Sequence, residues 1–225
     1  MVQKEVIQAI AEFIGTAHFL FMGLGGSDAI AALAGPGSDG VTLLATAFSF
    51  GWSLMINVWL WAEVSGGVLN PAITIALVAI GEFETLQGIY YIIAQFAGAL
   101  VGSLLIQLIQ PVPVAAITTL GSGTSVIQGF IMEMITTSIL TLAVLVLAIE
   151  KQGKFNAAFG IGSSLFISVL VAGPYTGASL NPARTFGPAL ATGKIYGEIW
   201  IYFVGPVLGS LLAVIYYKTS KSVYY

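Results

Sequence analysis

The tripeptide Asn-Pro-Ala occurs twice, and each copy opens a short apolar stretch. Asn at a helix N-cap accepts backbone N–H bonds through its side-chain oxygen, and Pro fits the first helical position. The Asn amide groups then keep N–H donors for another partner. Helix N-termini carry partial positive charge, so two that meet attract an electronegative atom and repel cations and protons. The two copies therefore predict a shared site for a neutral polar molecule such as water. The residues of the two motifs are Asn70, Pro71, Ala72, Asn181, Pro182 and Ala183.

The two motifs belong to a longer internal repeat. SGGVLNPAIT, which begins at Ser65, recurs as TGASLNPART at Thr176, and AEFIGT at Ala11 is echoed by MEMITT at Met132. One Asn-Pro alone would be interpreted most simply as a helix start, but two copies in equivalent repeat positions favour a function. We interpret residues 1–225 as a single domain made of two repeats, about 1–110 and 126–225.

The elements that position these motifs must lie in lipid. Of the 225 residues 57% are hydrophobic and 8% are charged, whereas soluble domains have about 25% charged residues. Apolar stretches of about 20 residues are long enough to cross a bilayer, and without a two-residue alternation they predict helices rather than barrel strands. The expected spans are Val6–Gly26, Val41–Ala62, Gln87–Ile109, Val126–Ile149, Ala157–Gly173 and Glu198–Tyr217. The shorter stretches Pro71–Ile80 and Pro182–Ala191 are expected to be half-helices.

Each repeat then contains three full spans. An odd number of spans means that the second repeat enters the membrane from the opposite side, which places a functional site at the midplane. The basic residues support one orientation, because short Lys-rich and Arg-rich loops stay in the cytoplasm. With these residues on one side, both termini are predicted to be cytoplasmic. They are Lys4, Lys151, Lys154, Lys218 and Lys221.

Three charged residues fall within apolar segments, where an unpaired charge is costly. Arg184 follows Asn181 by three positions, and Glu12 and Glu133 occupy equivalent places in the two repeats. The carboxylates need hydrogen-bond donors. No carboxylate, Ser/His or metal-ligand arrangement typical of an enzyme is present. We therefore expect neither catalysis nor a metal or other cofactor, and the absence of a basic run argues against nucleic acid as a partner. The one histidine, His18, is expected to be packed and hydrogen-bonded.

Taken together, the doubled Asn-Pro-Ala segments, the AEFIGT opening and the ARTFGPAL run resemble the aquaporin (major intrinsic protein) family across nearly the whole chain. The resemblance implies an all-α membrane protein of six tilted helices and two re-entrant half-helices. It also implies a homotetramer with one pore in each protomer. Glutamates like Glu12 and Glu133 support, in this family, the loops that precede the half-helices.

The family's selectivity filter corresponds by spacing to Phe50, Val169, Ala178 and Arg184. Val169 departs from the pattern, since water-selective members often have His there, and Val68 is a second such departure. A less polar and wider filter would pass hydrogen peroxide or ammonia as well as water. The residues that separate water channels from glycerol channels resemble the water-selective pattern, namely Thr185, Ala189, Tyr202 and Phe203.

We therefore expect a passive, single-file water channel that excludes ions and protons, in the plasma membrane rather than an internal membrane. The alternative is a broader channel for hydrogen peroxide, ammonia or glycerol. Two rivals from other classes have less support. A junction protein that conducts little would show a damaged filter, and a coupled transporter would need further carboxylates at the midplane.

Overall fold

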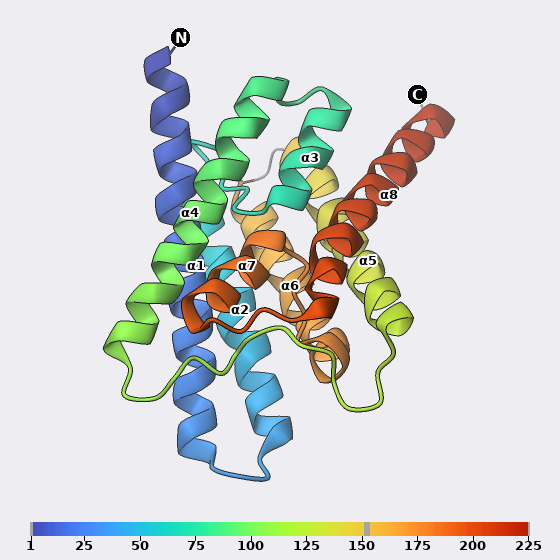
Figure 1. Cartoon of the computed structure of the whole chain (residues 1–225). Helices are drawn as coiled ribbons and strands as arrows, with labels where there is room; N and C mark the ends of the chain where they lie inside the picture. The colour runs from blue at the N-terminus through green and yellow to red at the C-terminus, as the bar shows by residue number, and fades with distance from the viewer. Residues whose placement is uncertain (1, 151–153, 225) are drawn as a thin grey trace.

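A computed structural model describes residues 2–150 and 154–224 of the chain as an all-helical bundle (Figure 1). Over those residues, six helices are long and apolar enough to cross a membrane. The long helices are α1 (Val2–Ala34), α2 (Asp39–Trp61), α4 (Thr85–Ile109), α5 (Val126–Ala143) with its π-helical continuation η1 (Val144–Glu150), α6 (Lys154–Thr176) and α8 (Ile201–Tyr224), which the 3₁₀ turn η2 (Gly197–Trp200) precedes. The predicted all-α architecture is confirmed.

Two short helices complete the bundle, α3 (Pro71–Ile80) and α7 (Pro182–Thr192). With 10 and 11 residues, each is about 15 Å long, or half of a hydrocarbon core of roughly 30 Å. Gly81 and Gly193 end them in the left-handed conformation, with φ of 85° and 68°, which glycine adopts without steric cost. In Figure 1, α3 lies nearer the end of the bundle that carries both termini, and α7 lies farther from it.

The long helices pack in the same pairs in each half of the chain. In the first half α1 packs against α2 and α4, and in the second half α5 packs against α6 and α8. Glycine makes these approaches possible. A Cβ atom on Gly102 would collide with the Ala17 carbonyl of α1, and one on Gly209 would collide with the Met134 carbonyl of α5. Small residues at such positions let helices pack backbone to backbone.

Helix α1 extends eight residues beyond the expected end at Gly26, and the prediction of its boundary was wrong there. The glycines at its expected end allow close packing and do not break the helix. A Cβ on Gly26 would lie 2.5 Å from the Ser49 hydroxyl of α2, and the Ser27 hydroxyl donates to the Gly23 carbonyl one turn back. His18 is exposed on the outer face of α1, so the expectation of a packed histidine was also wrong.

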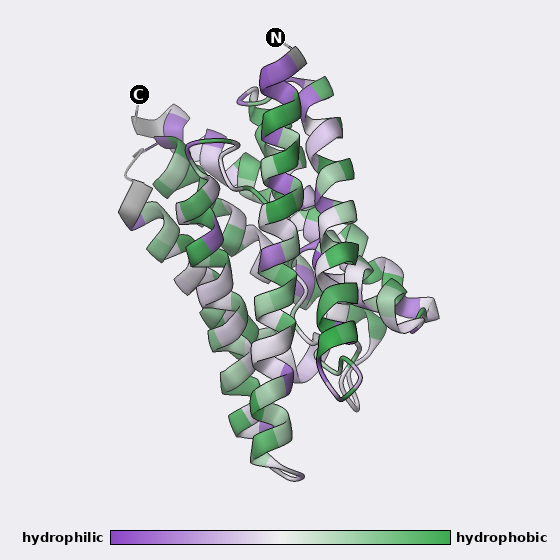
Figure 2. Cartoon of the chain, turned by 90° about the vertical axis from the view of Figure 1, so that its left-hand side faces the viewer, coloured by the Kyte–Doolittle hydropathy of each residue, from purple (hydrophilic) through white to green (hydrophobic). Residues whose placement is uncertain are grey.

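The arrangement of the chain ends agrees with an even number of crossings. Figure 1 shows both termini at one end of the bundle and the α1–α2 and α4–α5 connections at the other. Hydrophobic residues run along most of the helix length, while hydrophilic residues gather near the end with the termini (Figure 2). Lys4 and Lys218 belong to that end, and Lys151 lies outside the described residues.

Candidate pore and selectivity filter

Asn70 and Asn181 are the N-cap residues of the two half-helices. Both have extended backbone conformations, with φ of −149° and −155°. The Asn70 Oδ1 accepts from the Ala72 N–H at 2.9 Å, and the Asn181 Oδ1 accepts from the Ala183 N–H at 2.9 Å. These bonds satisfy N–H groups at the start of a helix that have no partner within the helix.

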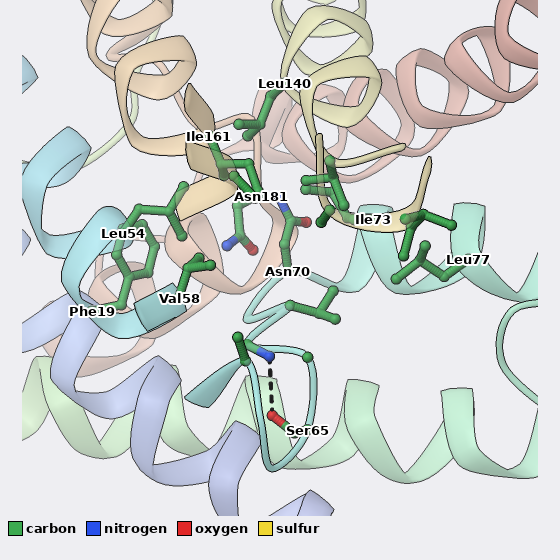
Figure 3. A pocket seen from close by; sticks show the side chains of 18 of the residues that line it. Phe19, Leu54, Val58, Ser65, Asn70, Ile73, Leu77, Leu140, Ile161 and Asn181 are labelled. Carbon is green, nitrogen blue, oxygen red and sulfur yellow. Dashed lines mark hydrogen bonds between the residues drawn. The ribbon is translucent and has the colours of Figure 1, made fainter. Parts of the chain in front are cut away.

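The two Asn side chains also tie the repeats together. The Asn70 Nδ2 donates to the Leu180 carbonyl at 2.8 Å, and the Asn181 Nδ2 donates to the Leu69 carbonyl at 2.8 Å. Because an amide nitrogen carries two hydrogens, each Asn has one N–H left after this exchange. The sequence predicted spare donors, and the structure shows that half of them bind the opposite repeat. The two amide groups lie close together at the centre of the cavity view (Figure 3).

The residue before each Asn adopts a conformation that L-residues rarely adopt. Leu69 and Leu180 both have φ of 53°. A non-glycine residue in this region costs about 1–2 kcal/mol. In both repeats this backbone turn presents the carbonyl that the opposite Asn binds. The strained leucines therefore belong to the same reciprocal clamp as the two Asn residues.

Glu12 holds the first of these turns. It is fully buried, and its carboxylate accepts from the Val68 N–H at 3.0 Å and the Leu69 N–H at 2.7 Å. The Ser65 hydroxyl donates to it at 2.6 Å, and the Gln95 Nε2 donates at 2.7 Å. Four donors thus surround a carboxylate that would otherwise be costly to bury.

Glu133 holds the second turn in the same way. It is also fully buried and accepts from the Ser179 N–H at 2.9 Å and the Leu180 N–H at 2.8 Å. The Thr176 hydroxyl, which is equivalent to that of Ser65, donates at 2.7 Å. The donors that the sequence analysis required are therefore backbone N–H groups and hydroxyls of the loops that lead into α3 and α7.

The four residues expected at the filter are all buried and come from three parts of the chain. Phe50 on α2, Val169 on α6 and Ala178 before α7 belong to one apolar cluster. The guanidinium carbon of Arg184 lies 4.5 Å from the centre of the Phe50 ring. At this distance the cation stacks on the ring face, a favourable contact where water is excluded.

Carbonyl groups face the Arg184 guanidinium. Its Nη1 donates to the Ala116 carbonyl at 3.0 Å, and its Nη2 lies 3.5 Å from the Gly177 carbonyl, at the limit of a hydrogen bond. The Nε is buried without a hydrogen-bond partner. The Arg184 guanidinium is thus held by a neutral carbonyl and an aromatic face, and its Nε–H remains available as a donor.

A cavity of about 440 Å³ runs to the Asn pair. Ser179, Leu180, Asn70 and Asn181 line it, together with the apolar side chains of Phe19, Leu54, Val58, Ile73, Leu77, Leu140, Ile161 and Leu165. In Figure 3 these apolar groups surround the two Asn amides. The cavity reaches Gln8, Glu63 and Glu82 at its other end and is not lined by the expected filter residues. The Asn amides are thus set among apolar side chains, and the cavity has polar side chains again at Gln8, Glu63 and Glu82.

The α4–α5 connection also reaches the filter, which the sequence analysis missed. Besides Ala116, its Thr118 hydroxyl bonds to the Thr185 hydroxyl on α7 at 2.8 Å, and the Tyr196 hydroxyl donates to the Thr118 carbonyl. Burial raises the pKa of the Tyr196 phenol above its ordinary value, so it remains a donor at neutral pH. Backbone carbonyls leave no mark in a sequence, so no motif indicated this loop.

The described residues hold no group of three or more His, Cys, Asp or Glu side chains that could bind a metal ion. The polar groups that converge in the bundle are amides, hydroxyls, backbone groups and buried ionisable side chains with structural partners, such as Glu12, Glu133 and Arg184. This arrangement can orient a small neutral molecule by hydrogen bonds and exclude charge.

Comparisons with known proteins agree with the architecture. The model of the Major intrinsic protein family matches residues 2–217. Aquaporin-1 of Rhizophagus irregularis is 56% identical over 218 residues, which cover 96% of this chain and 78% of that protein. Aquaporin-1 of Laccaria bicolor is 40% identical and is covered to 73%. Aquaporin-7 of Botryotinia fuckeliana is 39% identical over 99% of this chain, which spans only 51% of that longer protein.

A solved structure shares the fold. The X-ray structure of the aquaglyceroporin from Plasmodium falciparum matches with a TM-score of 0.84 over 95% of both chains, at 24% identity. At this identity the likeness concerns the fold alone. With the family model and the relatives above, the chain belongs to the major intrinsic protein family of multi-pass membrane channels, the family of the aquaporins, and is not an enzyme.

Proposed function

We propose that water crosses this aquaporin-type chain in single file, down an osmotic gradient, between the Asn70 and Asn181 amides and past Arg184. The observation that carries the proposal is the reciprocal clamp at the inner end of the cavity. Each Asn amide gives one hydrogen to the opposite repeat and keeps one for a molecule in the passage. Two such donors suit the oxygen of a water molecule.

The same geometry opposes proton and cation passage. A water oxygen that accepts from both Asn side chains turns its own hydrogens toward the two pore mouths, which interrupts a continuous chain of donors. The N-termini of α3 and α7 add partial positive charge at that point. Apolar side chains surround the two amides at that point, among them Ile73, Leu140 and Ile161.

We assign Phe50, Val169, Ala178 and Arg184 to the filter and Glu12 and Glu133 to loop support. The contact between Arg184 and Phe50 leaves little width on that side for a three-carbon polyol. The positive charge adds a second barrier against cations. The glutamates support the function indirectly, since their hydrogen bonds hold the turns whose carbonyls bind the Asn pair.

A second candidate is permeation of hydrogen peroxide or ammonia together with water. Val169 is 1% exposed and lies in the apolar cluster with Phe50 and Ala178. An aliphatic side chain forms no hydrogen bond there, so it cannot favour water over another small neutral molecule by hydrogen bonding. Discrimination among small neutral solutes then depends on their size. Hydrogen peroxide is only slightly larger than water, so size excludes it weakly.

The arrangement in the membrane is part of the proposal. We place residues 1–225 as a single channel domain of two inverted repeats, with both termini in the cytoplasm and the plasma membrane as its site. We also propose a homotetramer, in which each protomer keeps its own pore. The exposed apolar side chains of α2 and α6, such as Leu44, Phe48, Phe159 and Ile167, offer surface for lipid and for neighbouring protomers.

The test is a stopped-flow comparison of purified protein in proteoliposomes. An outward osmotic gradient of sucrose reports water permeability, glycerol in place of sucrose reports polyol entry, and a peroxide-sensitive dye trapped inside reports peroxide uptake. We expect water permeability well above that of empty vesicles, glycerol entry at the level of empty vesicles, and measurable peroxide uptake. Glycerol entry comparable to water would overturn the water-selective assignment.

A further inference from the structure

We propose that Asp28, near the C-terminal end of α1, is a positioning residue that sets the selectivity filter through the α4–α5 connection. The inference rests on the proposed function, in which Arg184 belongs to the filter. The chain of contacts is short. Asp28 binds the backbone of Ala115 and Ala116, and the Ala116 carbonyl binds the Arg184 guanidinium.

Asp28 is buried, with 4% of its surface exposed. Its carboxylate accepts from the Ala116 N–H at 2.9 Å, from the Ala115 N–H at 3.3 Å and from the Gln110 Nε2 at 3.0 Å. A carboxylate is favoured for this task because it accepts several N–H bonds at once, and bonds to a charged acceptor are stronger than neutral ones. Two of the three donors belong to consecutive residues of the loop, so Asp28 fixes both the place and the orientation of that backbone.

Ala116 connects the carboxylate with the filter. Its N–H points to Asp28 and its carbonyl accepts from the Arg184 Nη1 at 3.0 Å. The other carbonyl near the guanidinium, that of Gly177, lies at 3.5 Å. Ala116 therefore supplies the better hydrogen bond of the two, and its position determines where the guanidinium rests against the Phe50 ring.

The indirect arrangement has a physical advantage over a direct ion pair. A carboxylate in contact with Arg184 would neutralise the positive charge that opposes cations. The Asp28 carboxylate instead accepts hydrogen bonds from backbone N–H groups, and the guanidinium donates to a neutral carbonyl. Other bonds hold the loop farther along, where Thr118 contacts Thr185 and Tyr196. Gln107 holds Val114 on the other side, whereas the N–H groups of Ala115 and Ala116, next to Arg184, bind Asp28.

The test measures cation leak and water permeability of the same proteoliposomes, in a double-mutant cycle with Arg184. Asp28→Asn keeps the size of the side chain but replaces one acceptor oxygen with a donor group, which disfavours the loop N–H bonds. We expect the ratio of cation leak to water permeability to rise about tenfold, the size of effect of one lost hydrogen bond to a charged group. In an Arg184→Val background, the same substitution should leave this ratio unchanged, because the guanidinium that Asp28 positions through Ala116 is absent.

Two further variants keep the inference falsifiable. Asp39→Asn removes an exposed carboxylate from the first turn of α2 and should behave as wild type. If Asp28→Asn does not accumulate in membranes, Asp28→Glu replaces it, since the longer side chain displaces Ala116 and raises the ratio, again only when Arg184 is present. Equal increases with and without Arg184, or no increase for either Asp28 variant, would overturn the role of Asp28. A wild type that conducts no water would instead overturn the proposed function.

Discussion

The two loops that lead into the half-helices, Ser65–Asn70 and Thr176–Asn181, share a backbone design, but only the second leads into a half-helix with a charged residue, Arg184. In each, a buried glutamate accepts from two consecutive backbone N–H groups and one hydroxyl. The first glutamate takes its fourth donor from Gln95. The second lies near the buried cation Arg184. The first repeat has the apolar Ile73 at the equivalent position, three residues after its Asn.

This difference separates two tasks of the channel. The shared features, which are the turns and the Asn clamps, are symmetric about the centre of the bundle and orient the permeant. The cation occurs in one repeat only and biases the passage on one side of the clamp. Duplication thus supplies the symmetric water site, and divergence of single residues supplies the filter.

Removal of the cation tests this separation most strongly. Arg184→Val should raise cation or proton permeability relative to water permeability by about a hundredfold, because two like unit charges about 6 Å apart repel by about 3 kcal/mol at an effective dielectric constant of about 20. Water permeability should change much less. Voltage clamp of expressing cells measures the leak, and Lys194→Val, which removes an exposed charge just beyond α7, is the control. An unchanged leak would contradict the filter assignment.

The glutamates test the shared design. Glu133→Gln and Glu12→Gln each put an amide N–H₂ group where the carboxylate accepts N–H bonds. A buried donor left without a partner costs about 1–3 kcal/mol. We expect the larger loss of stability for Glu133→Gln, since it also removes a negative charge near Arg184, whereas the Gln95 side chain can reorient toward an amide at position 12.

Thermal unfolding in detergent measures this pair of variants. Both midpoints should fall, that of Glu133→Gln further, and water permeability per channel should fall in both. Equal shifts would mean that the charge of Glu133 adds nothing to the hydrogen bonds that the two glutamates share.

The smallest expected effect concerns the apolar wall of the filter. Val169→His adds a bulkier, polar side chain and should lower peroxide uptake relative to water permeability by about tenfold, the usual size of discrimination by a few atoms in a pocket. Val169→Ala should shift the ratio in the opposite direction. This ratio is measured as isotonic peroxide uptake divided by osmotic water permeability in the same vesicles. If the ratio is equal in all three proteins, Val169 does not control selectivity.

Much of the fold followed from hydrophobic length and from the repeat. Both half-helices begin where the Asn-Pro pairs predicted, because N-cap preference and the fixed φ of Pro act within a few residues. The end of α1 did not follow, because glycines that would end an isolated helix are here required for packing against α2. Tertiary packing decides such boundaries, and His18 shows the same limit, since the sequence does not indicate which face of α1 lies outward.

The candidate site was only partly predictable for a related reason. Asn70, Asn181 and the two glutamates stood out by residue type and by repetition. The bonds between each Asn and the opposite repeat did not, because the acceptors are the carbonyls of Leu69 and Leu180. The same holds for Ala116 and Asp28, whose contact depends on a loop path that no local pattern encodes.

The most direct test of the central claim measures water and proton flux together in proteoliposomes of the wild-type protein. An osmotic step gives the water permeability, and a pH gradient with an internal pH dye gives the proton flux. The convergent half-helices and the paired amides predict rapid water flow with a proton flux equal to that of empty vesicles. Water flow no faster than in empty vesicles, or protons that move with the water, would contradict the account.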